Sequence, residues 1–453
     1  MKLFGTAGIR GSVVERVTPE LALAVGRAAG RPGEEFVVAR DGRETGAALA
    51  AAMEAGLESA GADVRRAGML PTPALAFASR GRRGVVLTAS HNPPTDNGIK
   101  LFDDGVEYDR AAERDVESRV ADDDPPLPWD EWGSSIREDV LDEYRDAVIE
   151  YARAHGAPLD GLRVAVDCGN GMGSLATPQV LRALGARAVT LNANVDGHFP
   201  GRASKPTPET LTDLQSFVAD GDFAFGLAHD GDADRIVLVN GDGEFVHEDT
   251  VVAVLAEHYT RESDAPDPVV VTTPNASARI DERVRAAGGR VERVRLGALH
   301  EGIASTLEAG DDDTEVVFAA EPWKHIHTRF GGWIDGVTSA AVLARLVADA
   351  GGVEPLRGEV TERPYRKVSV DCPDAAKEEA MERIEATIPD RFPEAAVRTE
   401  HGVRAELPDG SWILVRPSGT EPYVRIYAES EDVDGLVAEA EAVVEGAVSD
   451  SRG

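Results

Sequence analysis

The chain contains little lysine and a large excess of acid, and this imbalance limits its possible partners. Six lysines stand beside 41 arginines, and 81 acidic against 47 basic residues give a formal net charge of -34 at pH 7. So acidic a surface repels nucleic acid and anionic lipid, so we expect no nucleic acid and no membrane as a partner. The shortage of lysine favours adaptation to a salt-rich cytoplasm, where ions screen self-repulsion, over an ordinary acidic surface.

Long apolar runs and paired cysteines are also missing. No apolar run approaches the ~18 residues of a membrane span, and the first residues lack the apolar stretch of a signal peptide. The two cysteines, Cys168 and Cys372, lie far apart and match no metal-binding spacing. A disulfide framework is therefore not expected, and a reducing, cytoplasmic location fits the composition. Because aromatics make up only 5% of the chain, the cores must consist of aliphatic residues.

What the sequence does contain is a succession of strand–helix units. Its 453 residues suggest three or four domains. Apolar strands followed by helical stretches recur over 1–150, 151–252 and 253–357, which predicts three similar α/β domains with mixed sheets. The remaining residues, 358–453, alternate in polarity and end in an acidic helix, a pattern typical of an antiparallel α+β domain. Ligands gather beyond the carboxyl ends of parallel strands, where informative motifs stand in this chain.

The first motif places a serine directly after a predicted strand. The segment 88–94 reads Thr-Ala-Ser-His-Asn-Pro-Pro, with Ser90 beside His91 and ten residues before Lys100. A serine hydroxyl is a poor nucleophile unless a base or a prior modification activates it. Ser, Asn and Pro are also ordinary turn residues, but the longer context, continuing through Asp-Asn-Gly-Ile-Lys, indicates a functional serine.

The second motif presents three carboxylates at alternate positions. Asp230, Asp232 and Asp234 follow an apolar strand, and another apolar strand comes after them. Carboxylates so spaced can turn toward one hard cation. A calcium EF-hand is excluded because its sixth position would be Arg235 rather than Gly and its twelfth Gly241 rather than Glu. The alternative is a solvated acidic turn, but the flanking apolar strands favour a metal-binding loop.

The third motif lies between two predicted strands near the C-terminus. The segment 416–422 reads Arg-Pro-Ser-Gly-Thr-Glu-Pro, and Arg425 stands nearby. Backbone N–H groups around a glycine, two hydroxyls and arginine side chains form a suitable cradle for phosphate. Taken alone, the segment is more typical of a hairpin loop with Pro and Gly than of a phosphate site.

Together with the segment 4–11, Phe-Gly-Thr-Ala-Gly-Ile-Arg-Gly, these motifs resemble the alpha-D-phosphohexomutase superfamily over essentially the whole chain. Ser90 matches the family's phosphoserine, the three aspartates match its magnesium ligands, and 416–422 matches its phosphate loop. The resemblance implies four domains around one active-site cleft. It also implies a Mg²⁺ held by Ser90 phosphate and the three aspartates.

The resemblance further assigns roles around the serine. Arg10, His91 and Lys100 are expected beside the phosphoserine, with Lys100 placed to accept or relay a hydroxyl proton. The phosphoryl group would move to a sugar hydroxyl, and the bound hexose 1,6-bisphosphate would then turn over to return its other phosphate. Residues outside the serine loop are expected to bind the substrate: Arg235, Arg416, Ser418, Gly419, Thr420 and Arg425.

The sugar loop departs from the family pattern Gly-Glu-x-Ser-Gly-His, because this chain reads Ala-Glu-Pro-Trp-Lys-His. Glu321 is expected to bind sugar hydroxyls, and His325 is a candidate proton donor. Trp323 and Lys324 replace two small residues, so we expect both to contact the sugar and influence which sugar fits. His327 is interpreted as structural.

The predicted activity is interconversion of hexose 6-phosphate and hexose 1-phosphate. The 416–422 loop is more similar to the phosphoglucosamine mutase branch, with glucose and mannose phosphates as alternatives. A metal-dependent phosphatase would use the same serine and let water finish the reaction. A non-catalytic sugar-phosphate sensor is a further alternative, but the intact Ser90, Lys100 and three aspartates argue against it.

Overall fold

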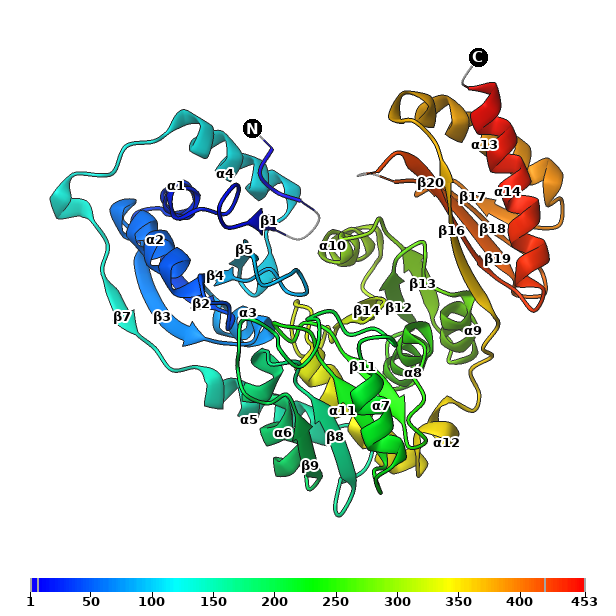
Figure 1. Ribbon diagram of the computed structural model, residues 1–453, viewed down its shortest axis with the longest axis horizontal. Helices are drawn as coiled ribbons and strands as arrows, with labels where there is room; N and C mark the ends of the chain where they lie inside the picture. The colour runs from blue at the N-terminus through cyan, green and yellow to red at the C-terminus, as the bar shows by residue number, and fades with distance from the viewer. Residues whose placement is uncertain (1, 6–7, 419–420, 452–453) are drawn as a thin grey trace. The chain divides into compact units, whose positions relative to one another are not determined.

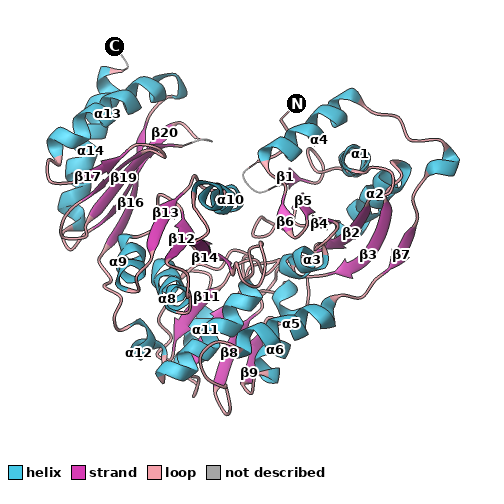
Figure 2. Ribbon diagram, turned by 180° about the vertical axis from the view of Figure 1, so that it is seen from behind, coloured by secondary structure: helices cyan, strands magenta, loops and turns pink. Residues whose placement is uncertain are grey.

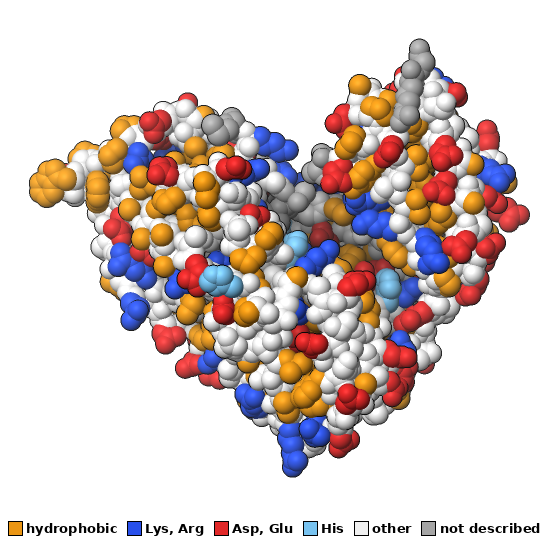
Figure 3. All heavy atoms as spheres, in the orientation of Figure 1, with side chains coloured by type: hydrophobic (Ala, Val, Ile, Leu, Met, Phe, Trp, Pro, Cys, Tyr) orange, Lys and Arg blue, Asp and Glu red, His pale blue; other side chains and the backbone are white. Residues whose placement is uncertain are grey.

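The computed structural model describes residues 2–5, 8–418 and 421–451 and divides the chain into two compact units. Unit 1 comprises Met1–Val251 and Val317–Gly358, and unit 2 comprises Val252–Val316 and Glu359–Gly453. Within the described residues, no helix is both long and apolar enough to cross a membrane. On the face drawn in Figure 3, acidic and basic side chains are interspersed.

The first sheet of unit 1 is mixed and carries the serine motif. Its strand order is β1-β5-β4-β2-β3-β7, and β6 pairs with β5 (Figure 1). The strands are β1 (Ile9–Ser12), β2 (Glu35–Arg40), β3 (Asp63–Met69), β4 (Arg83–Leu87), β5 (Asp96–Asp103), β6 (Val106–Glu107) and β7 (Ser135–Arg137). Strand β2 runs parallel to β3 and β4, whereas β5 runs antiparallel to β1 and β4. The helices of this part are α1 (Pro19–Ala29), α2 (Gly46–Ser59), α3 (Thr72–Ala78) and α4 (Arg110–Asp122).

Local signals explain where these helices begin. Thr18 accepts a hydrogen bond from the N–H of Leu21, and Pro19 occupies the first turn of α1, where its missing N–H has no intrahelical role. Asp109 caps α4 in the same way. Aliphatic side chains of α1, α2 and α4 then pack on the sheet in one core, as the low aromatic content predicts.

The second sheet of unit 1 carries the aspartate motif. Its order is β11-β10-β8-β9, with β10 parallel to β8 and antiparallel to β11. The elements are α5 (Leu141–Arg153), β8 (Arg163–Asp167), α6 (Thr177–Ala183), β9 (Arg187–Leu191), α7 (Thr212–Ala219), β10 (Phe225–Ala228) and β11 (Val237–Asn240). Unit 1 also contains the antiparallel pair β14 (Thr314–Glu321) and β15 (Lys324–Ile326), whose first strand begins before the division, and the helices α11 (Gly336–Ala350) and α12 (Val353–Arg357).

Unit 2 contains a parallel strand pair and an antiparallel sheet. Strands β12 (Asp267–Thr272) and β13 (Arg290–Arg293) pair in parallel, and α9 (Ala278–Ala286) and α10 (Leu299–Ala309) belong to the same stretch of chain. Helix α8 (Glu248–Arg261) begins before the division between units. Short 3-10 turns elsewhere in the chain are η1 (Trp129–Glu131), η2 (Met172–Leu175) and η3 (Asp374–Ala376).

The antiparallel sheet has the order β16-β20-β19-β18-β17, and Figure 2 shows α13 and α14 along it. Its elements are β16 (Tyr365–Asp371), α13 (Lys377–Arg391), β17 (Ala396–Arg398), β18 (Val403–Glu406), β19 (Trp412–Pro417), β20 (Tyr423–Glu429) and α14 (Val433–Asp450). Aliphatic residues of both helices and of the sheet form one core. The prediction of mixed α/β sheets followed by an α+β module is confirmed. The exact domain boundaries stay a prediction.

Candidate active site

Ser90 stands in a strained turn just beyond β4. Its backbone lies in the left-handed region at φ 51°, and its side chain is fully buried. The Ser90 N–H donates to Thr88 Oγ1 at 2.9 Å, and its carbonyl accepts from Ser204 Oγ at 3.0 Å. Such a conformation costs of order 1–3 kcal/mol for a residue other than glycine and persists where the surroundings impose it.

The surroundings that impose the turn include Arg43, a residue that the sequence analysis missed. Its buried guanidinium pairs with Asp41 at 3.0 Å. Its Nη atoms donate, at 2.6–2.9 Å, to four carbonyl oxygens of the loop, those of Ser90, Asn92, Pro93 and Asp96. The available signal was Asp-Gly-Arg directly after the strand β2, which lies beside β4 in the sheet.

The three predicted metal ligands converge just beyond β10. Asp230, Asp232 and Asp234 are completely buried, and one oxygen from each lies within 4.8 Å of the others. The intervening Ala233 takes the left-handed conformation at φ 60°, which folds the loop back on itself. Thr72 donates to one oxygen of Asp232 at 2.7 Å. Among the described residues, Asp232 Oδ1 and Asp234 Oδ1 have no hydrogen-bond partner.

The electrostatics of these buried carboxylates also suit a cation. Burial and the charges of Asp234 and Asp232 raise the pKa of Asp230 to about 8. Burial would also raise the pKa of Asp234, but Lys100 and the other nearby cations hold it well below its usual range. Buried acceptors without donors are costly, so the cluster fits a hard divalent ion that prefers oxygen ligands. The three aspartates therefore form a cluster that can hold a metal ion.

The serine and the aspartates form one site. Ser90 Oγ donates to Asp230 Oδ2 at 2.6 Å and lies 3.3 Å from His91 Nδ1. Burial, together with Arg235 and Arg10, lowers the pKa of His91 to about 2, so its ring is neutral at pH 7. Arg10 presents two buried guanidinium nitrogens, Nε and Nη2, without hydrogen-bond partners among the described residues. These nitrogens can donate hydrogen bonds to an anionic group near the serine.

Lys100 lies at the same site but is held as a cation. Its Nζ donates to Asp234 Oδ2 at 3.1 Å and pairs with Glu107 at 3.3 Å. Burial alone would lower the pKa of Lys100, but these two carboxylates outweigh burial and raise it above its usual range. The charge is therefore available to an anionic group, whereas acceptance of a proton is disfavoured.

The predicted sugar loop is joined to the aspartate loop through the backbone. Lys324 forms a β-bridge with Arg235, and the N–H of Ile236 donates to the Trp323 carbonyl at 3.1 Å. Trp323 is left-handed at φ 68°, and its ring packs against the core of the second sheet. Glu321 and Lys324 lie at opposite positions in the register of β14 and β15. His325 is buried on β15, and burial lowers its pKa to about 3.

In unit 2, the predicted phosphate loop contains two adjacent arginines. Arg416 and Arg425 lie directly opposite each other on β19 and β20, and both approach the Tyr427 hydroxyl, at 3.4 and 3.5 Å. Like charges at opposite positions destabilise a sheet unless an anion lies between them. The Ser418 carbonyl accepts from Lys377 Nζ at 2.7 Å. Gly419 and Thr420 lie outside the described residues.

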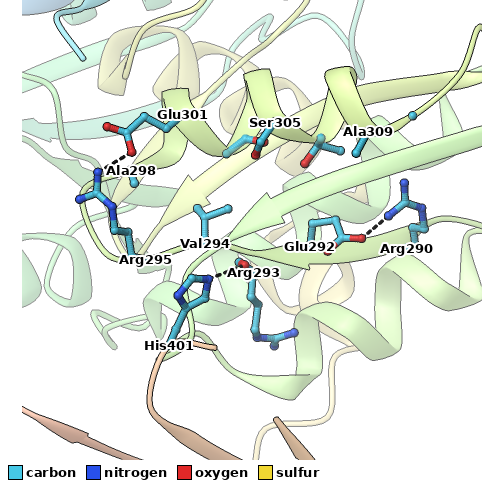
Figure 4. A pocket seen from close by; sticks show the side chains of 13 residues that line it. Arg290, Glu292, Arg293, Val294, Arg295, Ala298, Glu301, Ser305, Ala309 and His401 are labelled. Atoms are coloured by element: carbon cyan, nitrogen blue, oxygen red, sulfur yellow. Dashed lines mark hydrogen bonds and ion pairs between the residues drawn. The ribbon is translucent and has the colours of Figure 1, made fainter. Parts of the chain in front are cut away.

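A separate cavity of about 730 Å³ lies beside α10 in unit 2 and contains none of the predicted site residues (Figure 4). Its arginines are already engaged: Arg290 contacts Glu292, and Arg295 contacts Glu301. His401 Nε2 donates to the Arg293 carbonyl at 3.2 Å. We therefore place the chemistry at the smaller, fully buried cluster of unit 1.

Comparison with protein-family models identifies matches over most of the chain. Residues 1–126, 142–243 and 247–364 match the alpha/beta/alpha domains I, II and III of phosphoglucomutase/phosphomannomutase, and residues 368–446 match its C-terminal domain.

Similar proteins are mutases by name. The chain is 42% identical to a phosphopentomutase of Thermococcus kodakarensis, covering 95% of this chain and 94% of the relative. It is 41% identical, with the same coverage, to a probable phosphoglucosamine mutase of Methanopyrus kandleri. A crystal structure of a phosphoglucomutase/phosphomannomutase family protein from Burkholderia thailandensis matches with a TM-score of 0.86 at 26% identity, covering 99% of this chain and 97% of that one. This chain therefore belongs to the phosphoglucomutase/phosphomannomutase family and is a phosphomutase.

Proposed function

We propose that the chain moves a phosphoryl group between Ser90 and a hydroxyl of a sugar phosphate, through a sugar bisphosphate. One observation carries the proposal: the Ser90 hydroxyl lies 2.6 Å from Asp230, inside a buried cluster of three aspartates, at the end of a strand. A serine in a strained, immobilised turn beside such a cluster suits phosphoryl transfer, where positioning and charge neutralisation supply most of the catalysis.

Mg²⁺ is the proposed ion, and Asp230, Asp232 and Asp234 would hold it together with an oxygen of phosphoserine. The donors are all oxygens, and two of them accept no hydrogen bond from the described residues. Hard carboxylate ligands of this kind suit magnesium rather than a softer metal. When bound, the ion would neutralise charge on the phosphoryl group during transfer.

Cationic side chains of the chain complete the proposed mechanism. Arg10 and Lys100 bind the phosphate on Ser90, because both present positive charge at the cluster and Arg10 has nitrogens without partners. Glu321 and His325 serve the sugar, and Arg416 and Arg425 bind a phosphate group of the substrate that is not reacting. Arg416 and Arg425 suit that role because an anion bound between them would relieve their mutual repulsion.

The proposed substrates are hexose 1- and 6-phosphates, with glucosamine phosphate first. The name of the Methanopyrus kandleri relative supports glucosamine, as does the 416–422 sequence. A pentose phosphate is the second candidate, because the Thermococcus kodakarensis relative is named a phosphopentomutase. A cytoplasmic location fits the two buried cysteines, Cys168 and Cys372, which are not joined in a disulfide.

The test is a panel of 1-phosphates of glucosamine, glucose, mannose and ribose, assayed with Mg²⁺ in high potassium chloride. Isomer and inorganic phosphate are measured in the same reaction. We expect isomer without stoichiometric phosphate release and the highest kcat/KM for glucosamine 1-phosphate. A preference for ribose 1-phosphate would transfer the assignment to pentoses. Stoichiometric inorganic phosphate without isomer would instead indicate a phosphatase.

A further inference from the structure

Two buried histidines of unit 1 share one hydroxyl group. His325 Nδ1 lies 3.0 Å from Ser339 Oγ, and His327 Nε2 lies 2.8 Å from the same atom. The serine is on the first turn of α11, and all three side chains have at most 1% of their surface exposed. Because these side chains are so little exposed to water, the contacts determine which ring nitrogens are protonated.

The hydroxyl hydrogen of Ser339 is donated to one acceptor. Ser339 Oγ lies 2.7 Å from the backbone carbonyl of Asp335, four residues earlier in the chain. A carbonyl oxygen can only accept, so the one hydroxyl hydrogen must point at it. The serine oxygen then has only lone pairs for the two imidazoles. Both histidines must therefore donate, His325 from Nδ1–H and His327 from Nε2–H.

The position of Ser339 is itself fixed. Asp335 caps α11, because its carboxylate accepts from the N–H of Thr338 at 2.7 Å. The same carboxylate accepts from the Tyr144 hydroxyl at 2.9 Å and from Trp333 Nε1 at 3.1 Å. The Asp335 N–H donates to the carbonyl of His325 at 2.8 Å, which ties the helix start to β15. These contacts fix the start of α11, and with it the Ser339 hydroxyl, relative to β15.

We infer that Ser339 is a positioning residue that holds His325 as the Nδ1–H tautomer and leaves Nε2 as a proton acceptor at the active site. The inference rests on the proposed mutase function. Nε2 of His325 is buried and has no hydrogen-bond partner among the described residues. An unsatisfied buried acceptor is costly and usually has a functional reason. Burial also lowers the pKa of this ring to about 3, which keeps it neutral before reaction.

The proposed reaction consists of two half-reactions, and His325 Nε2 takes part in both. The sugar hydroxyl gives its proton to Nε2, and its oxygen forms a bond to the phosphorus of phosphoserine. The bond from phosphorus to Ser90 Oγ breaks, and that oxygen keeps the electron pair. In the second half-reaction Ser90 Oγ forms a bond to the phosphorus of the other phosphate, the bond from that phosphorus to its sugar oxygen breaks, and this oxygen takes the proton back from Nε2. From the sequence, His325 is predicted to be a proton donor. This tautomer makes it a proton acceptor in the first half-reaction and a proton donor in the second.

Ring nitrogen NMR tests the tautomer in the wild-type protein. In ¹⁵N-labelled protein, two-bond ¹H–¹⁵N correlations distinguish protonated from unprotonated imidazole nitrogens, and loss of a signal in His325→Gln assigns the ring. We expect His325 to carry its proton on Nδ1 at pH 7. A His325 ring protonated on Nε2 would overturn the inference, whatever the enzyme turns over.

The Ser339→Ala variant then tests the positioning role. Without the hydroxyl we expect the His325 signals to shift toward Nε2–H and kcat to fall about 10- to 100-fold, with KM changed less than about threefold. Ser59→Ala is the matched control, because Ser59 is also buried on a helix and donates to the Gly56 carbonyl, away from any histidine. Ser339→Thr keeps the hydroxyl and should retain the tautomer.

The outcomes remain distinct. An unchanged tautomer in Ser339→Ala would contradict the role of the serine, even if the variant were less stable. If Ser339→Ala does not fold, the wild-type and Ser339→Thr spectra still decide the tautomer. A correct tautomer in a protein without mutase activity would refute the proposed function and leave the hydrogen-bond assignment standing.

Discussion

His325 shows how strongly one buried side chain can link stability to pH. Burial lowers the pKa of this ring to about 3, whereas the unfolded chain binds the proton near the ordinary value of about 6.5. The unfolded state therefore holds more protons below pH 6.5, and stability falls as the pH falls through that value toward 3.

His325 therefore makes the free energy of unfolding depend on pH. Between pH 7 and pH 5, His325 should contribute up to about 2 kcal/mol to the decrease in the free energy of unfolding. His325→Gln should lack that part of the decrease, because the amide does not titrate. Urea unfolding of both proteins at the two pH values measures it. Parallel losses in the variant and the wild type would show that the ring is not held neutral.

Trp323 combines an unusual backbone with a packing role. Its ring lies against the core of the second sheet, and Lys205 and Arg235 lie within about 6 Å of the ring centre. A smaller residue would open space near the metal loop and uncover part of that core.

Trp323→Ser should therefore change the ranking among glucosamine, glucose, mannose and ribose phosphates, measured as kcat/KM. It should also lower the free energy of unfolding by about 2 kcal/mol, less than the loss of a fully buried Trp. Trp323→Phe, which keeps an aromatic ring on the core, is the control. An unchanged sugar ranking in both variants would restrict the residue to packing.

At the scale of elements, the serine loop depends on one guanidinium. Arg43 crosses from the end of β2 to the loop after β4 and binds four of its carbonyl oxygens. The Ser90 backbone has two further hydrogen bonds, with Thr88 Oγ1 and with Ser204 Oγ.

Arg43→Ala should lower stability by about 3–5 kcal/mol, since it leaves Asp41 buried without its partner. It should also lower kcat more than about tenfold, because the serine would no longer be immobilised. Chemical unfolding and turnover are the measurements, and Arg187→Ala, at an exposed arginine of β9, is the control. Wild-type turnover in a folded Arg43→Ala protein would contradict the clamp.

The sequence predicted the parts of the site that lie in short continuous segments. Ser90 and the three aspartates follow apolar strands, so strand patterning and spacing were enough to single them out, whereas Lys100 lies within β5, ten residues after Ser90. Longer elements such as α2 and β2 also carry a clear apolar pattern in the sequence. Short edge strands such as β1 and β7 were not predicted, because three or four residues carry little periodicity.

Arg43 and Ser339 were missed for a different reason. Arg43 acts on backbone carbonyls about 50 residues away, and Ser339 acts on a histidine 14 residues earlier. Neither contact leaves a local pattern, since any backbone offers carbonyls and helices often contain serine. Only the folded chain identifies what they touch.

For the whole molecule, the charge of -34 dominates the response to salt. Many arginines pair with surface acids, as Arg31 does with Asp115 at 2.7 Å, but 47 basic residues cannot neutralise 81 acidic ones. Exposed pairs contribute little to stability, so the net repulsion persists and is weakened by added ions.

We therefore predict that the melting temperature rises from low to molar potassium chloride. Screening of self-repulsion gives the direction, and potassium sulfate at matched ionic strength separates it from effects of one anion. A flat or falling melting temperature would remove the interpretation that the surface is adapted to salt.

The central claim, that Ser90 carries the phosphate between two sugar oxygens, has one direct test. The enzyme is labelled with ³²P by a hexose 1,6-bisphosphate, freed of ligand, and mixed with unlabelled hexose 1-phosphate in a single turnover. Peptide mapping should place the initial label on Ser90, and Ser90→Ala should take up none. We predict that the label leaves Ser90 and appears in sugar phosphates. Its quantitative appearance as inorganic phosphate, or labelling and full turnover in Ser90→Ala, would contradict the account.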